Sequence, residues 1–522
     1  MKRKMQTDKM MVKSSGLEGK TGNQIAEHLR KVIGVAQMKG QASYPKKSPF
    51  DPPKKYPELT ARFSPDKSNK AYPLVRELFR EMGLDRENYG KKSWNPLGEV
   101  ISPGGKVVIK PNWVLDKSEH SLDALITHTS VIRAVIDYAW IACGPSGRID
   151  LIESPIQSTD WENLMKVTQA REMVSALKER GVNIHLQDIR TETFVEKEVL
   201  NILGWKFKIF YRKKLSGTEK GYTQVNLESE SSFHEVRSKA HLFRGIQQWT
   251  NKEATLAHDE KNHIYSIPNE LLEADVFINL PKLKTHRKAG VTLALKNLVG
   301  TVNNKDWLPH YIQGTPQKGG DEAPSVRPLH IKLIDALSIV PLSKTFGFSI
   351  RPPGIEKIWR KKIESDLHGL KNVRQANWYG GDTVWRMVYD LNKILIHADK
   401  NGSLKPAPQR KYFALVDGIV AGEGFGPLNS LPKKTGVILG GFDPLLVDFV
   451  GTRVMGFDEE KIKTLSNAGK QGKYAFGESD FSAVELKSKS KRWKGLLESP
   501  KNAFHFKPAP GWKGHIEKEV SG

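Results

Sequence analysis

Apolar runs alternate with amphipathic segments along most of the chain, in the order strand, helix, strand. The runs KVVIKPN (106–112), RIDLIE (148–153) and VNIHLQD (182–188) predict buried strands. Segments with helical periodicity separate them, over about 130–143 and 160–180. Parallel strands are joined by right-handed helical crossovers, so this order predicts βαβ units. The predicted fold class is α/β, with a mainly parallel twisted sheet and helices on both faces.

The same alternation resumes further along the chain. Strands are expected at 274–281, 412–417 and 436–441, and helices at about 289–299, 382–398, 444–455 and 459–468. Two stretches interrupt this pattern, and we interpret them as insertions at about 191–262 and 306–375. Residues 1–100 are rich in Lys and Pro and are expected to form an extended arm with one helix near 72–82. The sequence thus predicts a basic N-terminal extension (1–100), an α/β core (101–470) and a basic C-terminal tail (471–522).

A lysine-rich loop follows the predicted strand at 274–281. It carries Lys282, Lys284, His286, Arg287 and Lys288 just before a predicted helix, whose N-terminus favours negative charge. Lys288, Thr292 and Lys296 would then form one polar stripe on that helix. Clustered cations repel one another unless an anion lies between them, so this segment predicts an anion site. The alternative is a solvent-exposed basic loop.

Three other strands end in polar residues. Lys110 and Asn112 end one, Glu153 ends the next, and Asp417 opens a glycine-rich loop that contains Glu423. Ligands of open α/β sheets bind beyond the carboxyl ends of the strands, so these groups and the lysine loop could share one crevice. Each group also has a simpler interpretation: Glu153 could only pair with a nearby lysine, and Asp417 could only begin a turn.

Two further residues belong to this hypothesis. Asp448 lies in an apolar helix, FDPLLVDFVG, where a buried carboxylate needs a cation, a hydrogen-bond donor or a metal. Asp443, before Pro444, is expected only to cap that helix. His128 precedes the predicted helix at 130–143, within reach of the same strand ends. It is a second candidate, with His286, for proton transfer.

Composition narrows the classes of function. The 522 residues carry a formal net charge of +24, concentrated in 1–100, 344–374 and the last forty residues. This charge suits nucleic acid, a membrane surface or an anionic substrate, but no zinc finger, Walker loop or GxGxxG motif accompanies it. No apolar run is long enough to span a membrane and no secretory signal is evident, so a cytoplasmic protein is expected. Cys143 is the single cysteine, so this chain cannot hold an iron–sulfur cluster by four thiolates.

Several blocks carry a family resemblance: VVIKPNWV, THTSVIRAVIDYA, LIESP, DVFINLPKLKTHRKAGVTLALKNLVGTV, NWYGGDTVWRMVYDLN, LVDGIVAGEGFGP and GFDPLLVDFVGTRVMGFD. Between about 106 and 468 the chain resembles the domain-of-unknown-function 362 family, which has no settled general activity. Some members carry ferredoxin-like cysteine motifs, and this chain departs from them. The positions that match the family's blocks are Lys110, Asn112, Lys282, Lys284, His286, Lys296, Asn297, Asp417, Asp443 and Asp448, and no catalytic role is inherited with them.

These observations predict an enzyme acting on a carboxylated or phosphorylated small molecule. The expected acid–base residues are Lys110, His128, Lys284, His286 and Lys296. The expected substrate-binding residues are Asn112, Glu153, Lys282 and Asn297. Asp417, Glu423 and Asp448 are the candidate ligands of an optional divalent metal, the one cofactor considered. The alternatives are a nucleic-acid-binding protein and a non-catalytic scaffold that uses Trp378, Tyr379, Trp385 and Tyr389 as an interface. The sequence does not indicate the oligomeric state.

Overall fold

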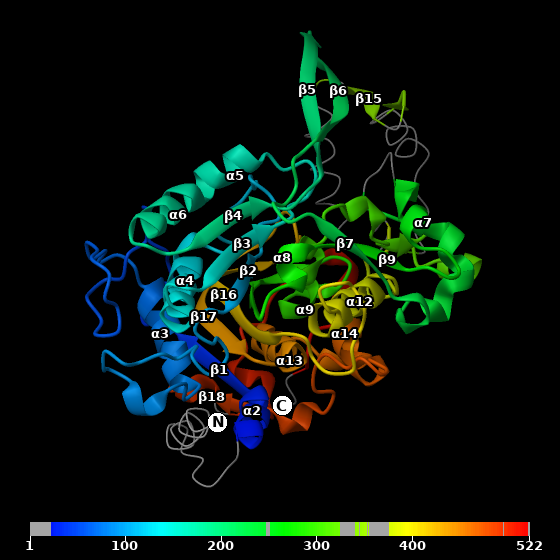
Figure 1. Cartoon of the computed structure of the whole chain (residues 1–522). Helices are drawn as coiled ribbons and strands as arrows, with labels where there is room; N and C mark the ends of the chain where they lie inside the picture. Colours follow the sequence, from blue (N-terminus) through cyan, green and yellow to red (C-terminus); the bar gives the residue numbers. More distant parts are fainter. Residues whose placement is uncertain are drawn as a thin grey trace.

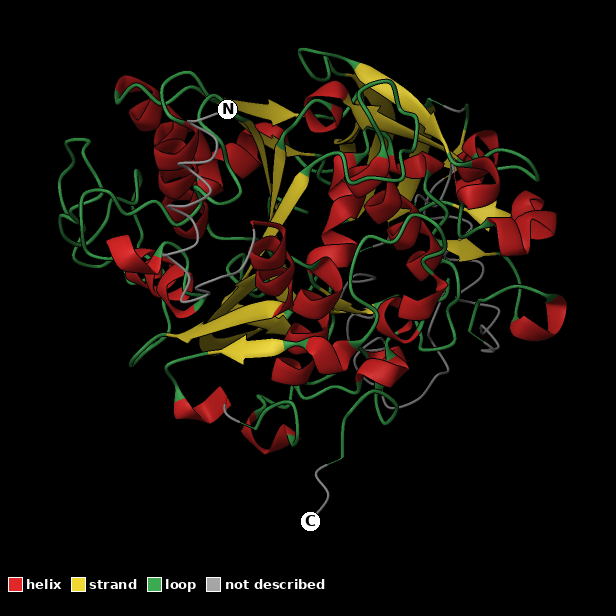
Figure 2. Cartoon of the chain, turned by 60° about the horizontal axis from the view of Figure 1, so that its bottom comes forward, coloured by secondary structure: helices red, strands yellow, loops and turns green. Residues whose placement is uncertain are grey.

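A mixed β-sheet forms the centre of the molecule (Figures 1 and 2). The computed structural model describes residues 22–246, 251–323, 340–343, 345–351, 353, 375–493 and 495–519. Within them the sheet has ten strands, eight of them in the order β18-β1-β17-β16-β10-β2-β3-β4. Their bounds are β18 Glu485–Lys487, β1 Val32–Gln37, β17 Leu431–Gly441, β16 Lys411–Glu423, β10 Val276–Leu280, β2 Lys106–Pro111, β3 Arg148–Glu153 and β4 Ile184–Asp188.

The strands from β16 to β4 are parallel, which confirms the predicted α/β class. Alternate residues of one strand enter different cores: Val107 and Ile109 pack on one face of the sheet, and Val108 packs on the other. Helices α3 (Ala71–Glu81), α4 (Thr129–Cys143), α5 (Trp161–Thr168) and α6 (Ala170–Glu179) cover the first face. Helices α9 (Ala294–Asn297), α12 (Val384–His397) and α13 (Pro444–Met455) cover the second. The central strands β2, β10 and β16 are mostly apolar because both of their faces are buried.

The predicted helix at 289–299 is wrong in its first half. The lysine loop is strand β11 (Lys282–His286), which runs parallel to β16 and turns back as β12 (Gly290–Thr292). Only α9 and a short 3-10 turn at Leu298–Thr301 are helical. Gly290 has φ +78, and a Cβ there would lie 2.4 Å from Ile462 Cδ1, so this position needs glycine in a tight turn. Lys288, Thr292 and Lys296 therefore share no helical stripe.

Other predicted helices are shorter than expected. The segment at 160–180 divides into α5 and α6 at Gln169, whose φ is 53. The segment at 459–468 contains only α14 (Lys463–Ser466) after a 3-10 turn.

The two ends of the chain are built into the core. After α2 (Gly22–Lys31), β1 pairs antiparallel with β17, and β18 from the C-terminal segment pairs with β1. Trp493 and Trp512 of the expected C-terminal tail are fully buried. The composition of this tail did not reveal the burial, because the tail has many lysines on its surface and only a few of its apolar residues are deeply buried.

The expected insertion at 191–262 is more regular than its polar pattern indicates. Strands β5 (Glu192–Ile202) and β6 (Trp205–Lys214) form a long hairpin, which projects from the body in a sheet with β15 (Phe346–Arg351) and β14 (Val340–Pro341) (Figure 1). Strand β7 (Tyr222–Asn226) pairs with β9 (Ile264–Pro268), and β8 (Phe243–Arg244) pairs with β13 (Tyr311–Ile312). The short helices α7 (Ala254–Ala257) and α8 (Asn269–Leu272) complete this region. The basic stretch 344–374 lies mostly outside the described residues.

Two expectations about the whole chain can be checked here. No helix in the described part of the chain is both long and apolar enough to cross a membrane. Cys143 is buried, and burial raises the pKa of its thiol to about 11, as befits a small core residue rather than a nucleophile.

Replacing Trp512 by alanine tests whether the C-terminal segment belongs to the core. The indole is buried beside Gly290, and its Nε1 donates to Arg287 O at 2.8 Å. Loss of a buried Trp should lower the free energy of unfolding by about 3–5 kcal/mol. Urea denaturation measures this, with Lys513→Ala, an exposed neighbour, as the control. Equal midpoints for the two variants would contradict the packing described.

Candidate anion-binding site

A small polar cavity opens at the carboxyl ends of β2, β3 and β10. Its volume is about 80 Å³. The polar residues that line it are Lys110, Asn112, Glu153, Ser154, Lys284, His286, Arg287, Lys288, Thr292, Lys296, Asn297, Lys305 and His310. Two of the three expected strand ends, those at Lys110 and Glu153, therefore meet the lysine loop at the edge of the sheet where α/β proteins bind ligands, and the third, at Asp417, does not line the cavity.

One ion pair forms the floor of this cavity. Lys110 Nζ lies 2.9 Å from both carboxylate oxygens of Glu153. The backbone amides of Trp113 and Ser154 also donate to Glu153, at 2.8 and 3.0 Å. Burial lowers the pKa of Lys110, and the Glu153 charge opposes that shift. The only carboxylate that lines the cavity is thus already engaged by one lysine and two amides.

Two asparagine side chains connect this pair to the neighbouring elements. Asn112 Nδ2 donates to Asn297 Oδ1 at 2.7 Å, and Asn297 Nδ2 donates to Asn279 Oδ1 at 2.7 Å. Asn112 Oδ1 is buried and accepts no hydrogen bond from the residues that the structure describes. The amides therefore fix the end of α9 against β2 and β10, and within the described residues they leave one acceptor unused.

Four further lysines line the cavity without any carboxylate partner among the described residues. Lys284 Nζ donates to Leu125 O at 2.6 Å, and Lys305 Nζ donates to Ser154 Oγ at 2.9 Å. Lys288 Nζ donates to the carbonyl oxygen of Gln375. Lys296 is only 8% exposed, and within the described chain its Nζ makes no hydrogen bond. Positive charge at this cavity therefore lacks the counter-charge that buried cations normally require.

The pKa values of these lysines reflect that excess. Burial, followed by the charge on Lys110, lowers the pKa of Lys296 to about 7. Burial, followed by Arg287, lowers the pKa of Lys288 to about 7. Burial also lowers the pKa of Lys305 to about 7. At neutral pH each amine therefore exchanges between its charged and neutral forms, and a bound anion would favour the charged form.

The two histidines of the cavity are opposite tautomers. His286 Nδ1 accepts hydrogen bonds from the amides of Lys288 and Ala289, at 3.0 and 3.2 Å, so Nε2 carries the proton. His310 Nδ1 donates to Leu308 O at 2.8 Å, so its Nε2 is an acceptor. Burial, followed by Lys296, holds the pKa of His286 well below its usual range, and burial lowers the pKa of His310 to about 3. Both rings are neutral, one as a donor and the other as an acceptor.

His128, Lys282 and Asp417 form a separate buried cluster. Lys282 Nζ lies 2.9 Å from Asp417 Oδ2, and Tyr44 OH donates to Asp417 Oδ1 at 2.5 Å. The His128 ring stacks on Tyr44 with centroids 4.1 Å apart, and its Nδ1 caps α4. None of the three lines the cavity.

The candidate metal ligands lie apart from one another. Glu423 pairs with Lys433 at 2.8 Å, and Asp448 accepts from the amide of Ala294 at 2.6 Å, which caps α9. Within the described residues, the one cluster of three metal-type ligands is Glu192, Glu253 and Asp306, and Arg212 contacts all three carboxylates. Asp417, Glu423 and Asp448 therefore do not form a shared site.

Seven sequence-predicted residues meet in the cavity: Lys110, Asn112, Glu153, Lys284, His286, Lys296 and Asn297. Lys305 and His310 were missed, because they lie where the sequence shows neither periodicity nor a motif. Arg287 and Lys288 were included in the predicted anion site of the lysine loop, but not among the expected acid–base or substrate-binding residues.

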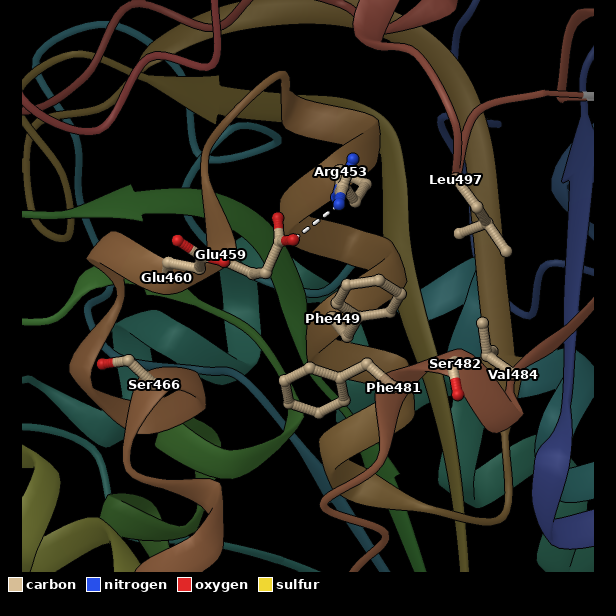
Figure 3. A pocket seen from close by; sticks show the side chains of 9 residues that line it. All are labelled: Phe449, Arg453, Glu459, Glu460, Ser466, Phe481, Ser482, Val484 and Leu497. Atoms are coloured by element: carbon tan, nitrogen blue, oxygen red, sulfur yellow. Dashed lines mark hydrogen bonds and ion pairs between the residues drawn. The ribbon is translucent and has the colours of Figure 1, made fainter.

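A larger cavity, of about 370 Å³, lies beside α13 (Figure 3). Phe449 and Phe481 stack in its wall with ring centroids 4.7 Å apart. Its one arginine, Arg453, pairs with Glu459 at 2.5 Å. Because that charge is compensated and no sequence-predicted site residue lines the cavity, the lysine-lined cavity is the better candidate.

The comparisons with known proteins agree with the family resemblance. A family model described as Domain of unknown function (DUF362) matches residues 219–453, a range that contains β11, α9, α12 and most of α13 but not β2 or β3. Thylakoid-associated protein sll1697 from Synechocystis sp. is 24% identical over 208 residues. That alignment covers 40% of this chain and 40% of that protein, so less than half of the relative's length is matched. No solved structure matches the chain.

Substituting Gly300 by alanine should separate the ion pair at the floor of the cavity. A Cβ at Gly300 would lie 2.2 Å from Glu153 Oε1 and 2.4 Å from Lys110 Nζ. Disrupting a buried pair should lower the free energy of unfolding by about 3 kcal/mol. Chemical denaturation provides the measurement. Gly469→Ala is the control, because no atom lies within 4 Å of its added Cβ. If both variants unfold like the parent protein, the pair has more room than the structure gives it.

Proposed function

We propose that this chain, a member of the DUF362 family through its residues 219–453, binds a small anionic molecule and catalyses a proton transfer between a lysine of the chain and that molecule. One observation carries the proposal: Lys284, Lys288, Lys296 and Lys305 are buried around one cavity, and none has a carboxylate partner among the described residues. Burying unpaired charge is unfavourable, so a fold that keeps four such groups together is suited to a ligand of opposite charge.

The chemistry of the donors favours a phosphate or carboxylate group. Lysine ammonium groups make short, charge-assisted hydrogen bonds to such oxygens from several directions. Arg287, which is exposed, would draw the anion toward the cavity. The free Oδ1 of Asn112 would accept a hydrogen bond from a hydroxyl or amine elsewhere on the ligand.

Lys296 is the proposed proton-transfer residue. In the free protein its amine has a pKa of about 7, and its Nζ has no other partner in the described chain. Because a bound anion favours the charged form, Lys296 would act as an ammonium that donates a proton to the ligand atom next to the anionic group and returns to the neutral amine. The Nε2–H of His286 would donate a hydrogen bond to the adjoining oxygen of the ligand.

The alternatives predicted from composition have less support. A cavity of about 80 Å³ lined mostly by buried side chains is too small for a nucleic-acid backbone. Trp378, Trp385 and Tyr389 are buried, so the aromatic box is core rather than an exposed interface. Assistance by a divalent metal is not part of the proposal, because its three candidate ligands are engaged elsewhere. The cytoplasmic location stays a prediction.

Sulfate is a suitable probe of the site, because it keeps its two charges across the neutral range. It should raise the melting temperature of the parent protein, and Lys296→Met should abolish most of that rise. Without sulfate, Lys296→Met should be more stable than the parent by about 1–3 kcal/mol, because it removes an unpaired buried charge. Lys393→Met is the matched control, since Lys393 is an equally buried lysine on α12 whose Nζ donates to Glu230 O. A sulfate shift that survives in Lys296→Met would place the anion elsewhere.

Anion binding should be coupled to proton uptake. In the free protein the pKa values of Lys288, Lys296 and Lys305 are about 7, and the anion raises them. Sulfate affinity should therefore rise as pH falls from about 8 to about 6, with uptake of about one proton at pH 7. Titration calorimetry in two buffers of different ionisation enthalpy measures this uptake. Proton release, or affinity that does not depend on pH, would contradict the assigned pKa values.

A further inference from the structure

The hairpin of β5 and β6 ends in an exposed apolar tip. Ile202 pairs with Trp205 across a two-residue turn formed by Leu203 and Gly204, whose φ angles are 50 and 82. Such turns normally take Asn or Gly at both positions. A leucine at the first position puts a large apolar side chain where the backbone favours a small or polar one.

Apolar exposure is concentrated at this tip. Val199, Leu200, Ile202, Leu203 and Trp205 are 50%, 48%, 52%, 91% and 44% exposed. Of the other exposed large apolar residues of the described chain, Val167 and Leu256 lie on separate helices, whereas Ile350 on β15 and Leu342 after β14 lie in the same sheet as the hairpin. Single exposed apolar residues are ordinary, but five within seven positions are typical of a contact surface.

The apolar side chains of the tip come from both strands and from the turn that joins them. Ile202 pairs with Trp205 and Leu200 pairs with Phe207, so these side chains share one face of the hairpin. Leu203 lies in the turn, beyond the last cross-strand pair. It would therefore be the first side chain to enter a medium that the hairpin meets end-on, such as the interfacial region of a lipid bilayer.

The charge around the tip is positive. Residues 192–214 contain six basic and three acidic side chains. The acidic ones pair with Lys208, Lys206 and Arg212. Lys197, Lys213 and Lys214 are exposed and form no ion pair with the described residues. This balance, in a chain of net charge +24, complements an anionic surface.

We propose that the β5–β6 hairpin is a membrane-surface anchor whose tip enters the headgroup region of an anionic bilayer. Tryptophan is preferred at that depth, and lysines beside it would contact lipid phosphates and carboxylates. From Val199 to Leu203 the strand extends about 13 Å, which is enough to reach the boundary between headgroups and acyl chains. The anchor does not depend on the anion site, so the two proposals can fail separately.

Vesicle co-sedimentation of the full chain tests the anchor. Vesicles of phosphatidylcholine and phosphatidylserine in equal parts should bind the parent protein, and vesicles of phosphatidylcholine alone should bind it at least about tenfold more weakly. Leu203→Asn, which suits the turn and removes the apolar side chain, should reduce binding to the mixed vesicles by at least about tenfold. Leu256→Asn, at an exposed leucine on α7, is the matched control and should bind like the parent.

A fluorescent probe tests the depth of the tip directly. Asn201→Cys can carry a polarity-sensitive label, because the native Cys143 is fully buried. Mixed vesicles should shift its emission to the blue, while a label at Lys400→Cys, in an exposed turn, should not respond. Unchanged binding by Leu203→Asn, or no shift at position 201, would overturn the proposal. So would a dimer that Leu203→Asn dissociates, because the tip would then be an interface between copies of this chain.

Discussion

Burial of lysine ammonium groups at the carboxyl edge of a parallel sheet is the constraint on which this structure depends. Removing an ammonium from water is unfavourable by several kcal/mol per ion, even after the protein relaxes. Lys110 meets this requirement with Glu153 and a carbonyl, Pro111 O at 2.8 Å, so every polar atom of the pair has a partner. Lys296, which lines the same cavity, has none in the described chain. Lys110, with its partners, is therefore part of the scaffold, whereas Lys296, without a partner in the described chain, is part of the candidate site.

Several distant segments are needed to hold that arrangement. Asp448 on α13 caps the short helix that carries Lys296, and burial raises the pKa of its carboxyl while the Ala294 and Leu295 amides oppose the shift. Trp512 supports the β11–β12 turn through Arg287 O. Lys305 Nζ donates to Ser154 Oγ and so holds the residue that directly follows β3. The cavity is therefore rigid because each wall is attached to a different part of the fold, which is the condition for holding like charges close together.

Local pattern and sheet geometry determine which features could be predicted from the sequence. Lys110 and Glu153 could be identified because parallel strands end at one edge, whatever the loops do. The helix assigned to 289–299 failed because apolar spacing alone does not distinguish a short hairpin from a helix, and the turn at Gly290 depends on Ile462, far along the chain. Asp417 illustrates the same limit. The strand predicted to end at Asp417 continues as β16 to Glu423, and Tyr44, from a segment expected to be an extended arm, hydrogen-bonds both the Asp417 carboxylate and Lys282.

The net charge of the sequence could not distinguish the two sites proposed to bind anions, which are the lysine-lined cavity and the β5–β6 hairpin. The cavity lysines are buried and lack counter-ions, so they can select a small ligand that enters without its hydration shell. The hairpin lysines are exposed, keep their water and surround apolar side chains, so they suit an extended surface rather than a single molecule. Salt screens exposed charges far more than buried ones. Membrane binding by the hairpin should therefore weaken with ionic strength much more steeply than anion binding in the cavity. This difference in salt dependence distinguishes the exposed lysines of the hairpin from the buried lysines of the cavity.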